Sequence, residues 1–183
     1  MTCYPEQNLC IRPLTREEIT PELFRCFDRF QIVEKCWRKV EGQWVVKDVV
    51  FTERWGEEDY RFLCQCLQNT VATGGQVWGA FLEGRLKGFA SVEGPLIGSQ
   101  KQYADLTSIH VSADARGHGL GRQLFQRAEE TGRRLGAKAL YISAHSSVES
   151  QAFYKAMGCV EATEYIPAHV EQEPCDCQLE CPL

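Results

Sequence analysis

Arg116-Gly117-His118-Gly119-Leu120-Gly121 is the stretch that decides the fold. Its three glycines lie between a predicted strand, residues 103–111, and a predicted helix that begins at Leu120. Glycine lacks a Cβ, so the backbone amides of such a turn can approach a phosphate closely, and the dipole of the following helix adds positive charge. The spacing matches neither a Walker A loop nor Gly-x-Gly-x-x-Gly. The stretch predicts a pyrophosphate cradle or, alternatively, a tight strand–helix turn that binds nothing.

The residues after the glycines predict a strand–helix–strand unit. Apolar residues recur at helical spacing from Leu120 to Leu135, and Gly136 ends the helix. Residues 139–142 then form a short apolar strand. Because strands joined through a helix run parallel with a right-handed crossover, residues 103–111 and 139–142 are expected to form a parallel pair.

The strand at residues 103–111 is expected to contain a β-bulge. Leu106 and Ile109 are three residues apart, so a regular strand cannot place both on one face. One extra residue near Thr107-Ser108 would restore the alternation. A bulge bends the strand and leaves backbone groups unpaired, and an extended ligand could bind these groups.

The rest of the chain shows no internal repeats and predicts further elements of an α+β protein. The predicted strands cover residues 9–12, 77–82, 86–92, 160–165 and 175–181, together with a hairpin over 37–50 that turns at Glu41-Gly42. The predicted helices cover segments between residues 15 and 35, residues 57–73, and a last stretch that ends near Met157. Ser146 or Ser147 caps this last helix, and Ser146-x-x-Glu149 fits a capping box.

A second motif lies downstream, at Phe153-Tyr154-Lys155-Ala156-Met157-Gly158. Arg116, Gly119 and Gly121 match the pattern Arg/Gln-x-x-Gly-x-Gly/Ala. The order and separation of the two motifs resemble those of the GNAT superfamily of acyl-CoA-dependent N-acetyltransferases, and the resemblance is firm over residues 103–159. It implies an α/β (α+β) single domain with a central mixed, mostly antiparallel sheet flanked by helices, in which one parallel strand pair is splayed at the β-bulge.

The resemblance also divides the chain and implies its cosubstrate, acetyl-CoA. Residues 1–101 are expected to form the acceptor side, with a hairpin insertion at about 37–55, residues 102–159 the acetyl-CoA-binding core, and residues 160–183 the C-terminal strands. The implied cofactor contacts are Ile109, His110, Val111, Arg116, Gly117, His118, Gly119, Leu120, Gly121, Arg122, Ser147 and Tyr154. Ser147 stands where members of the family often carry an asparagine.

The implied reaction is direct attack of an amine on the thioester, which requires two proton transfers. Removing the proton of a lysine-like amine at pH 7 costs about 4.6 kcal/mol. Asp105 is the leading candidate for the base, because many family members carry an acidic residue on this strand; the alternative is an ordinary solvated or paired aspartate. His110 and His145 are weaker candidates. The departing thiolate needs a proton donor, and the resemblance assigns this role to Tyr154. This residue is expected on the polar side of its predicted helix.

Composition favours a soluble globular protein. The 183 residues are 44% apolar and carry a net charge of −5, without a basic cluster for nucleic acid. No apolar window approaches the roughly 20 residues of a membrane-spanning helix, and residues 1–6 show no secretory signal. We therefore expect a cytoplasmic protein without nucleic-acid or membrane partners.

The chain contains ten cysteines, and the densest group lies near its C-terminus. Cys175, Cys177 and Cys181 alternate with polar residues, which predicts a strand with these cysteines and Leu179 on its buried face. A metal site would prefer paired ligands such as Cys-x-x-Cys, which this group lacks, so no metal is expected. A metal or redox role is the alternative.

The acceptor is less determined. A small-molecule amine is the first expectation, such as a polyamine, an amino acid or an aminated antibiotic; a protein N-terminus or lysine, and an acyl-CoA sensor without turnover, are the alternatives. Trp37, Trp44 and Trp55 either line a pocket for a cationic amine or pack the predicted hairpin onto the domain. A homodimer is expected only by analogy with the family.

Overall fold

The computed structural model describes residues 8–183; residues 1–7, which include the segment judged to lack a secretory signal, lie outside the described residues. The strands are β1 (Leu9–Pro13), β2 (Phe30–Val40), β3 (Gln43–Arg54), β4 (Gln76–Leu82), β5 (Arg85–Val92), β6 (Tyr103–Val111), β7 (Ala139–Ala144), β8 (Val160–Glu161) and β9 (Cys177–Pro182). The helices are α1 (Glu57–Ala72), α2 (Leu120–Arg134), α3 (Val148–Ala156) and α4 (Pro167–Gln172), with the 3-10 turns η1 (Pro21–Phe24) and η2 (Ala113–Ala115). Within residues 8–183 no helix has the length and apolar character needed to span a membrane.

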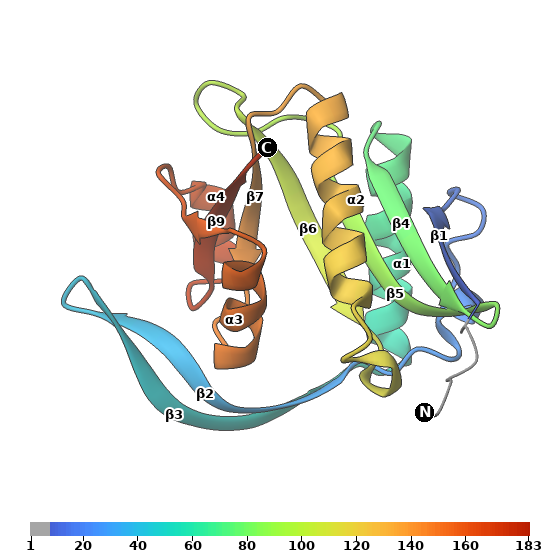
Figure 1. Cartoon of the computed structure of the whole chain (residues 1–183), viewed down its shortest axis with the longest axis horizontal. Coiled ribbons are helices and arrows are strands. Elements are labelled where there is room, and N and C mark those ends of the chain that lie inside the picture. Colours follow the sequence, from blue (N-terminus) through green and yellow to red (C-terminus); the bar gives the residue numbers. More distant parts are fainter. Residues whose placement is uncertain (1–7) are drawn as a thin grey trace, which may run out of the picture.

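Seven strands form one sheet in the order β1-β4-β5-β6-β7-β9-β8, and β2 and β3 form a separate hairpin. Every neighbouring pair in the sheet is antiparallel except β6 and β7, which run parallel. In Figure 1 the long β2–β3 hairpin leaves the sheet and passes close to α3. This arrangement confirms the expected mixed, mostly antiparallel sheet with one parallel pair.

The β-bulge in β6 lies where the parity of its apolar residues predicts it. Ser91 of β5 pairs with Ser108, whereas the next residue, Val92, pairs with Leu106, so Thr107 is the extra residue. The pairing of β6 with β7 covers only the three residues from Tyr103 to Asp105. Beyond the bulge the two parallel strands therefore separate, which confirms the expected splay.

Helices cover both faces of the sheet (Figure 1). On one face α2 packs in a core cluster with the central strands and with Tyr154 of α3. On the other face α1 and the chain around η1 pack in a second cluster, which contains Leu67 and Phe24 together with Phe89 of β5. The central strands therefore have both faces covered.

The expectation of helices between residues 15 and 35 is wrong. The helical part of this segment is the single 3-10 turn η1, which begins at Pro21, and β2 starts at Phe30. Val33 and Cys36 are buried while the residues between them are exposed, and a register shift in the pairing with β3 separates them. Pairing with a strand that comes later in the chain stabilises the extended conformation, and local propensity does not report it.

The C-terminal segment also differs from the prediction. The expected strand near residues 160–165 is only two residues long, and α4 follows it with Pro167 at its start, a helix-start signal that the prediction missed. The last strand begins at Cys177, so Cys175 lies outside it and is exposed, contrary to expectation. Cys177 and Cys181 are buried, as predicted.

Gly94 provides a test of how the end of α1 packs on the sheet. A Cβ at Gly94 would lie 2.4 Å from the carbonyl oxygen of Thr73, in the turn that follows α1, and the other near atoms also belong to backbone. We expect Gly94→Ala to lower the free energy of unfolding by about 1–3 kcal/mol, measured by urea denaturation. Gly56→Ala is the control, because its nearest neighbour would be 3.8 Å away. Equal losses in the two variants would contradict this account.

Candidate active site

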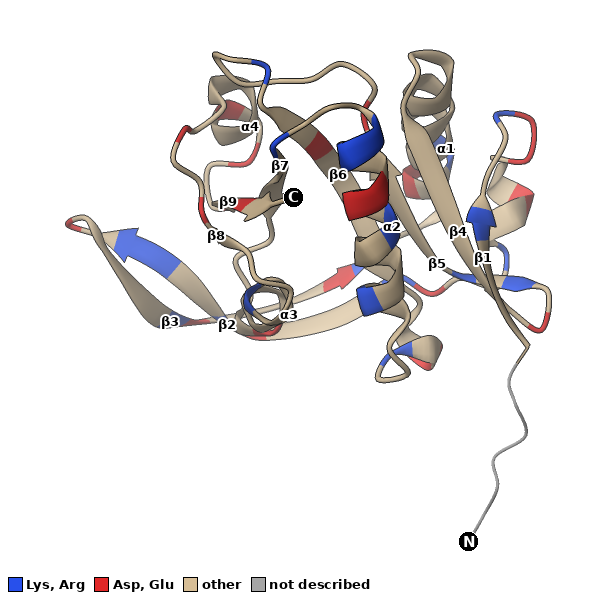
Figure 2. Cartoon of the chain, turned by 45° about the horizontal axis from the view of Figure 1, so that its top comes forward, with Lys and Arg blue, Asp and Glu red and all other residues tan. Residues whose placement is uncertain are grey.

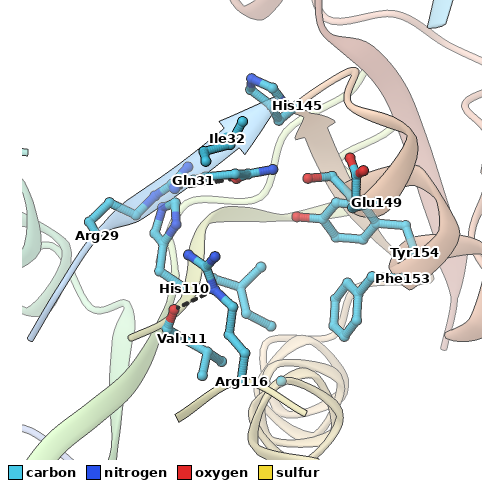
Figure 3. Close-up of a pocket in the computed structure, with 13 residues that line it drawn as sticks. Arg29, Gln31, Ile32, His110, Val111, Arg116, His145, Glu149, Phe153 and Tyr154 are labelled. Atoms are coloured by element: carbon cyan, nitrogen blue, oxygen red, sulfur yellow. Dashed lines mark hydrogen bonds between the residues drawn. The ribbon is translucent and has the colours of Figure 1, made fainter. Parts of the chain in front are cut away.

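A cavity of about 400 Å³ opens where β6 separates from β7, and we call it the bulge cavity. Figure 3 shows its lining side chains, which come from β6 beyond the bulge, from the chain entering α2, from α3 and from the base of the β2–β3 hairpin. They include Arg29, Ile109, His110, Val111, Arg116, Gly121, Phe153 and Tyr154. The cavity thus brings together the two sequence motifs, at Arg116–Gly121 and at Phe153-Tyr154.

One edge of β6 is open in this cavity. Ile109, His110 and Val111 pair with β5 on one side, and no described strand pairs with them on the other, because β7 has already diverged. The Val111 carbonyl accepts a hydrogen bond from Nε of Arg116 at 3.3 Å. The remaining main-chain groups of this edge are positioned to bind an extended ligand in the manner of an added strand.

The glycine loop has the conformation that a phosphate cradle requires. Gly117 and Gly119 have φ angles of 80° and 78°, and a Cβ on either would meet nothing within 4 Å, so the loop faces open space. The first main-chain bond of α2 runs from the Gln123 amide to the Gly119 carbonyl at 3.2 Å. Since this bond is the first of α2, the amides of the helix residues before Gln123 have no acceptor within the helix, and they can bind an anion. The residues present therefore fit the pyrophosphate of an acyl-CoA.

The other loop residues that were predicted to contact the cofactor differ in which of their atoms a ligand could reach. The Leu120 side chain is 2% exposed and packs in the core, so this residue can offer a ligand only its backbone. Gly121 lies against α3, where an added Cβ would be 3.1 Å from the ring of Phe153. His118 and Arg122 lie at the exposed start of α2. Close packing of the loop on α3 thus places the cradle beside Tyr154.

Tyr154 is the buried residue of α3, and its hydroxyl points into the bulge cavity (Figure 3). Its ring packs against Phe125 and Phe153, whereas Ala152 and Ala156 are exposed, so the expectation that Tyr154 lies on the polar side of this helix is wrong. Burial raises the pKa of Tyr154 well above its usual value. The phenol is therefore protonated at neutral pH and can donate a hydrogen bond.

Ser147 caps α3 rather than facing the cavity. Its hydroxyl accepts the Ser150 amide at 3.2 Å and donates to Oγ of Ser150 at 2.9 Å, and the Gln31 side chain donates to it at 3.3 Å. The cap is thus Ser147, and the capping box expected from Ser146 and Glu149 does not form. These bonds satisfy the hydroxyl inside the protein.

The two histidines considered as bases have other roles in the fold. Burial lowers the pKa of His110 to about 3, and its ring packs 4.9 Å from that of Trp55. His145 uses both ring nitrogens: Nε2 lies 3.1 Å from Glu53, and Nδ1 accepts the Ser147 amide at 3.1 Å. The hydrogen bond from His145 is the main reason that the pKa of Glu53 falls to about 2. Both histidines therefore make contacts that hold them within the fold.

A second cavity, of about 690 Å³, lies between α1 and α4 on the other face of the central strands. We call it the acidic cavity, because six carboxylates and one arginine line it: Glu53, Asp59, Glu93, Asp105, Glu173, Asp176 and Arg29. Arg29, His110 and His145 line both cavities, so the two cavities meet at these residues. Trp55 lines the acidic cavity, whereas Trp44 donates to Glu161 far along the hairpin.

Asp105 lies on the floor of the acidic cavity, on the strand segment coloured red within β6 in Figure 2. Its side chain is 8% exposed, and Oδ2 is 2.8 Å from Nε2 of His169. Oδ1 is buried without a hydrogen-bond partner among residues 8–183. His169 belongs to α4, stacks on the ring of Tyr141 and has a pKa raised mainly by its hydrogen bond to Asp105. Asp105 is therefore not solvated, whereas its pairing with His169 agrees with the other half of the alternative, a paired aspartate.

Arg29, like His169, is a site residue that the sequence analysis did not identify. It is 7% exposed, donates to Glu53 at 2.7 Å and to Gln31 at 3.3 Å, and lies over the face of Trp55. Its Nε is buried without a partner in the described part of the chain. Arg29 and Asp105 thus hold a free buried donor and a free buried acceptor, and both line the acidic cavity.

The motifs and geometry agree with a comparison against known families. A model described as the acetyltransferase (GNAT) family matches residues 31–159, well over half of the 183 residues. The chain belongs to the GNAT family of acetyltransferases. Membership confirms the expected enzyme class, an acetyl-CoA-dependent acetyltransferase. No curated protein matches the chain by sequence at a significant level.

Solved GNAT structures share the fold at low sequence identity. A nourseothricin acetyltransferase is 17% identical, with a TM-score of 0.68, over 95% of this chain and 98% of its own. A putative streptothricin acetyltransferase from Bacillus anthracis, solved with acetyl coenzyme A, is 15% identical, with a TM-score of 0.72, over 98% and 99%. The PaiA N-acetyltransferase from Thermoplasma acidophilum, solved with coenzyme A, is 16% identical, with a TM-score of 0.59, over 96% and 99%.

The Asp105–His169 pair predicts a pH dependence of stability. Because the folded-state pKa of His169 is raised, the stability that the pair contributes is fully present below the unfolded value of about 6.5 and is lost as pH rises through the folded value. We expect the free energy of unfolding, measured in urea at a series of pH values, to fall more steeply above pH 6.5 in the unmodified protein than in His169→Gln. Glutamine keeps a hydrogen bond to Asp105 but does not titrate. Parallel curves would show that the pair does not contribute.

Proposed function

We propose that this acetyltransferase moves the acetyl group of acetyl-CoA to a primary amine of a small cationic molecule. The observation that carries the proposal is the junction of the two cavities at Arg29, His110 and His145. One cavity offers anion-binding amides and an open strand edge, and the other is lined by carboxylates. Such a junction suits a reaction between an anionic acyl donor and a cationic acceptor.

Acetyl-CoA supplies the activated acetyl group as a thioester. In this proposal the amides of residues 116–122 hold its pyrophosphate, and the open edge of β6 from Ile109 to Val111 pairs with the pantetheine arm. A main-chain N–H on that edge is then placed to polarise the thioester carbonyl. The buried, unpartnered Nε of Arg29 is a second donor that could reach an oxygen of either substrate.

The acidic cavity favours an acceptor that is a cation and is small. Its carboxylates outnumber its single arginine. This excess of negative charge stabilises an ammonium ion in the site. The hairpin base contributes Arg29, Glu53 and Trp55 to the wall of this cavity, so the hairpin covers one side of the proposed acceptor site. A site covered on one side by the hairpin favours a small molecule over a protein tail, and the names of the nourseothricin and streptothricin acetyltransferases of similar fold support the same class.

Asp105 is proposed as the group that takes up the proton of the amine. Its free Oδ1 can accept a hydrogen bond from the ammonium, and His169 holds the other oxygen. The ammonium ion next to this carboxylate must lose a proton before the amine can attack the thioester. For a lysine-like amine at pH 7 the loss of this proton costs about 4.6 kcal/mol. Asp105, directly or through water, provides the acceptor that this step needs.

Tyr154 is proposed as the donor of a proton to the leaving thiolate. Its hydroxyl faces the bulge cavity, and because burial raises its pKa, the phenol is protonated at neutral pH and can donate its hydrogen to the departing sulfur. The Asp105 and Tyr154 side chains line different cavities, so one lies on the side of the incoming amine and the other on the side of the departing thiol. Proton uptake and proton delivery are thereby separated.

Binding of acetyl-CoA can be tested by thermal unfolding. A ligand at 100 times its dissociation constant stabilises the fold by about 2.7 kcal/mol, which raises the midpoint by several degrees in a domain of this size. We expect a rise with acetyl-CoA and none with NAD or ATP. Gly119→Val should abolish the rise, because its side chain would fill the space in front of the loop; Gly84→Val, in the β4–β5 turn at a similar positive φ, should retain it. No rise in the unmodified protein would refute the cofactor site.

The role of Tyr154 can be tested by its replacement with phenylalanine. Tyr154→Phe removes only the hydroxyl, so we expect kcat to fall by about 100-fold or more, the range of general acid catalysis. The thermal shift with acetyl-CoA should persist, because the ring still packs against Phe125 and Phe153. Tyr165→Phe, which removes a hydroxyl outside both cavities, is the control. The readout is the acetylated amine, detected by mass, since the cysteines would react with thiol dyes. An unchanged kcat in Tyr154→Phe would exclude the proposed role.

A further inference from the structure

The carboxylates of the acidic cavity differ in how they are neutralised. Glu53 contacts Arg29 and His145, Asp105 contacts His169, and Asp59 accepts the Gly56 amide at the start of α1. Glu93, Glu173 and Asp176 contact no lysine, arginine or histidine side chain within residues 8–183. The cavity therefore contains negative charge that the protein itself does not neutralise.

Glu93 lies next to Asp105 in the sheet. The Glu93 amide donates to the Asp105 carbonyl at 2.9 Å, on the neighbouring strand. The hydroxyls of Thr70 and Thr107 both contact Oε1 of Glu93 at 2.8 Å. Its Oε2 has no hydrogen-bond partner in the described part of the chain. The bulge residue thus fixes the orientation of Glu93 without neutralising it.

An independent observation in the same cavity points to a ligand. Asp105 is more than nine-tenths buried, lines the cavity and leaves Oδ1 without a partner. A buried carboxylate oxygen without a hydrogen bond is unfavourable unless a ligand supplies the donor. An ammonium group would supply it. A ligand that fills this space also removes Glu93 from solvent, which is unfavourable unless the ligand brings a hydrogen-bond donor, and a second ammonium would supply the donor and also offset the charge.

We propose that the acceptor is a diamine or larger polycation, with one amino group at Asp105 and a second ammonium at Glu93. The inference rests on the proposed function and narrows its acceptor class. Neighbouring strands are about 4.8 Å apart, so a short aliphatic spacer joins the two groups. Glu93 acts here as a specificity residue and does not take part in the chemistry.

Putrescine and n-pentylamine test this inference, because they have equal numbers of heavy atoms and differ by one ammonium. We expect kcat/KM, measured by mass detection of the product, to be roughly tenfold or more higher for putrescine, and the dissociation constants from calorimetry to differ in the same direction. In Glu93→Gln the ratio between the two amines should fall to near one. Glu171→Gln, an exposed carboxylate of α4 outside the cavity, is the matched control and should keep the ratio.

The outcomes separate the inference from the function on which it rests. Acetylation of both amines with equal kcat/KM would overturn the inference and leave the amine acetyltransferase in place. A preference for putrescine that survives in Glu93→Gln would overturn the role of Glu93. Selective binding of putrescine without turnover would support the second cation site and count against the proposed reaction. Neither binding nor acetylation of either amine would overturn both. The ratio in the unmodified protein decides the diamine preference even if the variant fails to fold.

Discussion

The single extra residue in β6 is the constraint on which the site depends. Thr107 restores the alternation of β6, so that Leu106 is buried and Ile109 packs against the same cluster. It also bends the strand away from β7, whose pairing ends at Asp105. The bend opens the bulge cavity and leaves the edge from Ile109 to Val111 unpaired. On the opposite side Thr107 contacts Glu93, so the same residue shapes both cavities. One residue in the sheet therefore supports the proposed donor site and the proposed acceptor site.

The elements that the sequence predicts correctly are those whose signals are local. The bounds of β6 follow from its run of apolar and β-branched residues, and its bulge follows from the parity of two of them. The glycines at 117, 119 and 136 all have positive φ, where only glycine is unstrained, so they mark the ends of α2 reliably. By contrast, β2 is stabilised by pairing with β3, and a strand in a hairpin arm alternates only weakly. The segment before it therefore resembles a helix when it is considered alone.

The motifs on the proposed cofactor side are visible in the sequence, whereas most of the residues that line the acidic cavity are not. The loop and the Phe153-Tyr154 motif are contiguous, and backbone geometry makes most of their proposed contacts. Arg29 and His169 acquire their roles from burial and from partners that are distant in the chain: 24 residues separate Arg29 from Glu53, and 64 separate His169 from Asp105. The sequence identifies Asp105 from its strand, but its unpartnered oxygen and its histidine partner depend on the packing of α4 against the sheet. The spacing of residues along the chain does not predict this packing.

The two cavities carry opposite charge on the two sides of their junction. On the side of the bulge cavity, the N-terminus of α2 and the arginines at 116 and 122 favour anions. On the side of the acidic cavity, the carboxylates favour cations. The wall between them holds His110, which burial keeps neutral, and the pair of Arg29 and Glu53, whose charges offset each other. Because this wall is neutral overall, the positive charge of the bulge cavity and the negative charge of the acidic cavity do not cancel each other there. An anionic donor and a cationic acceptor would then be drawn to opposite entrances and meet only at the junction, which accounts physically for two cavities of opposite character on one strand.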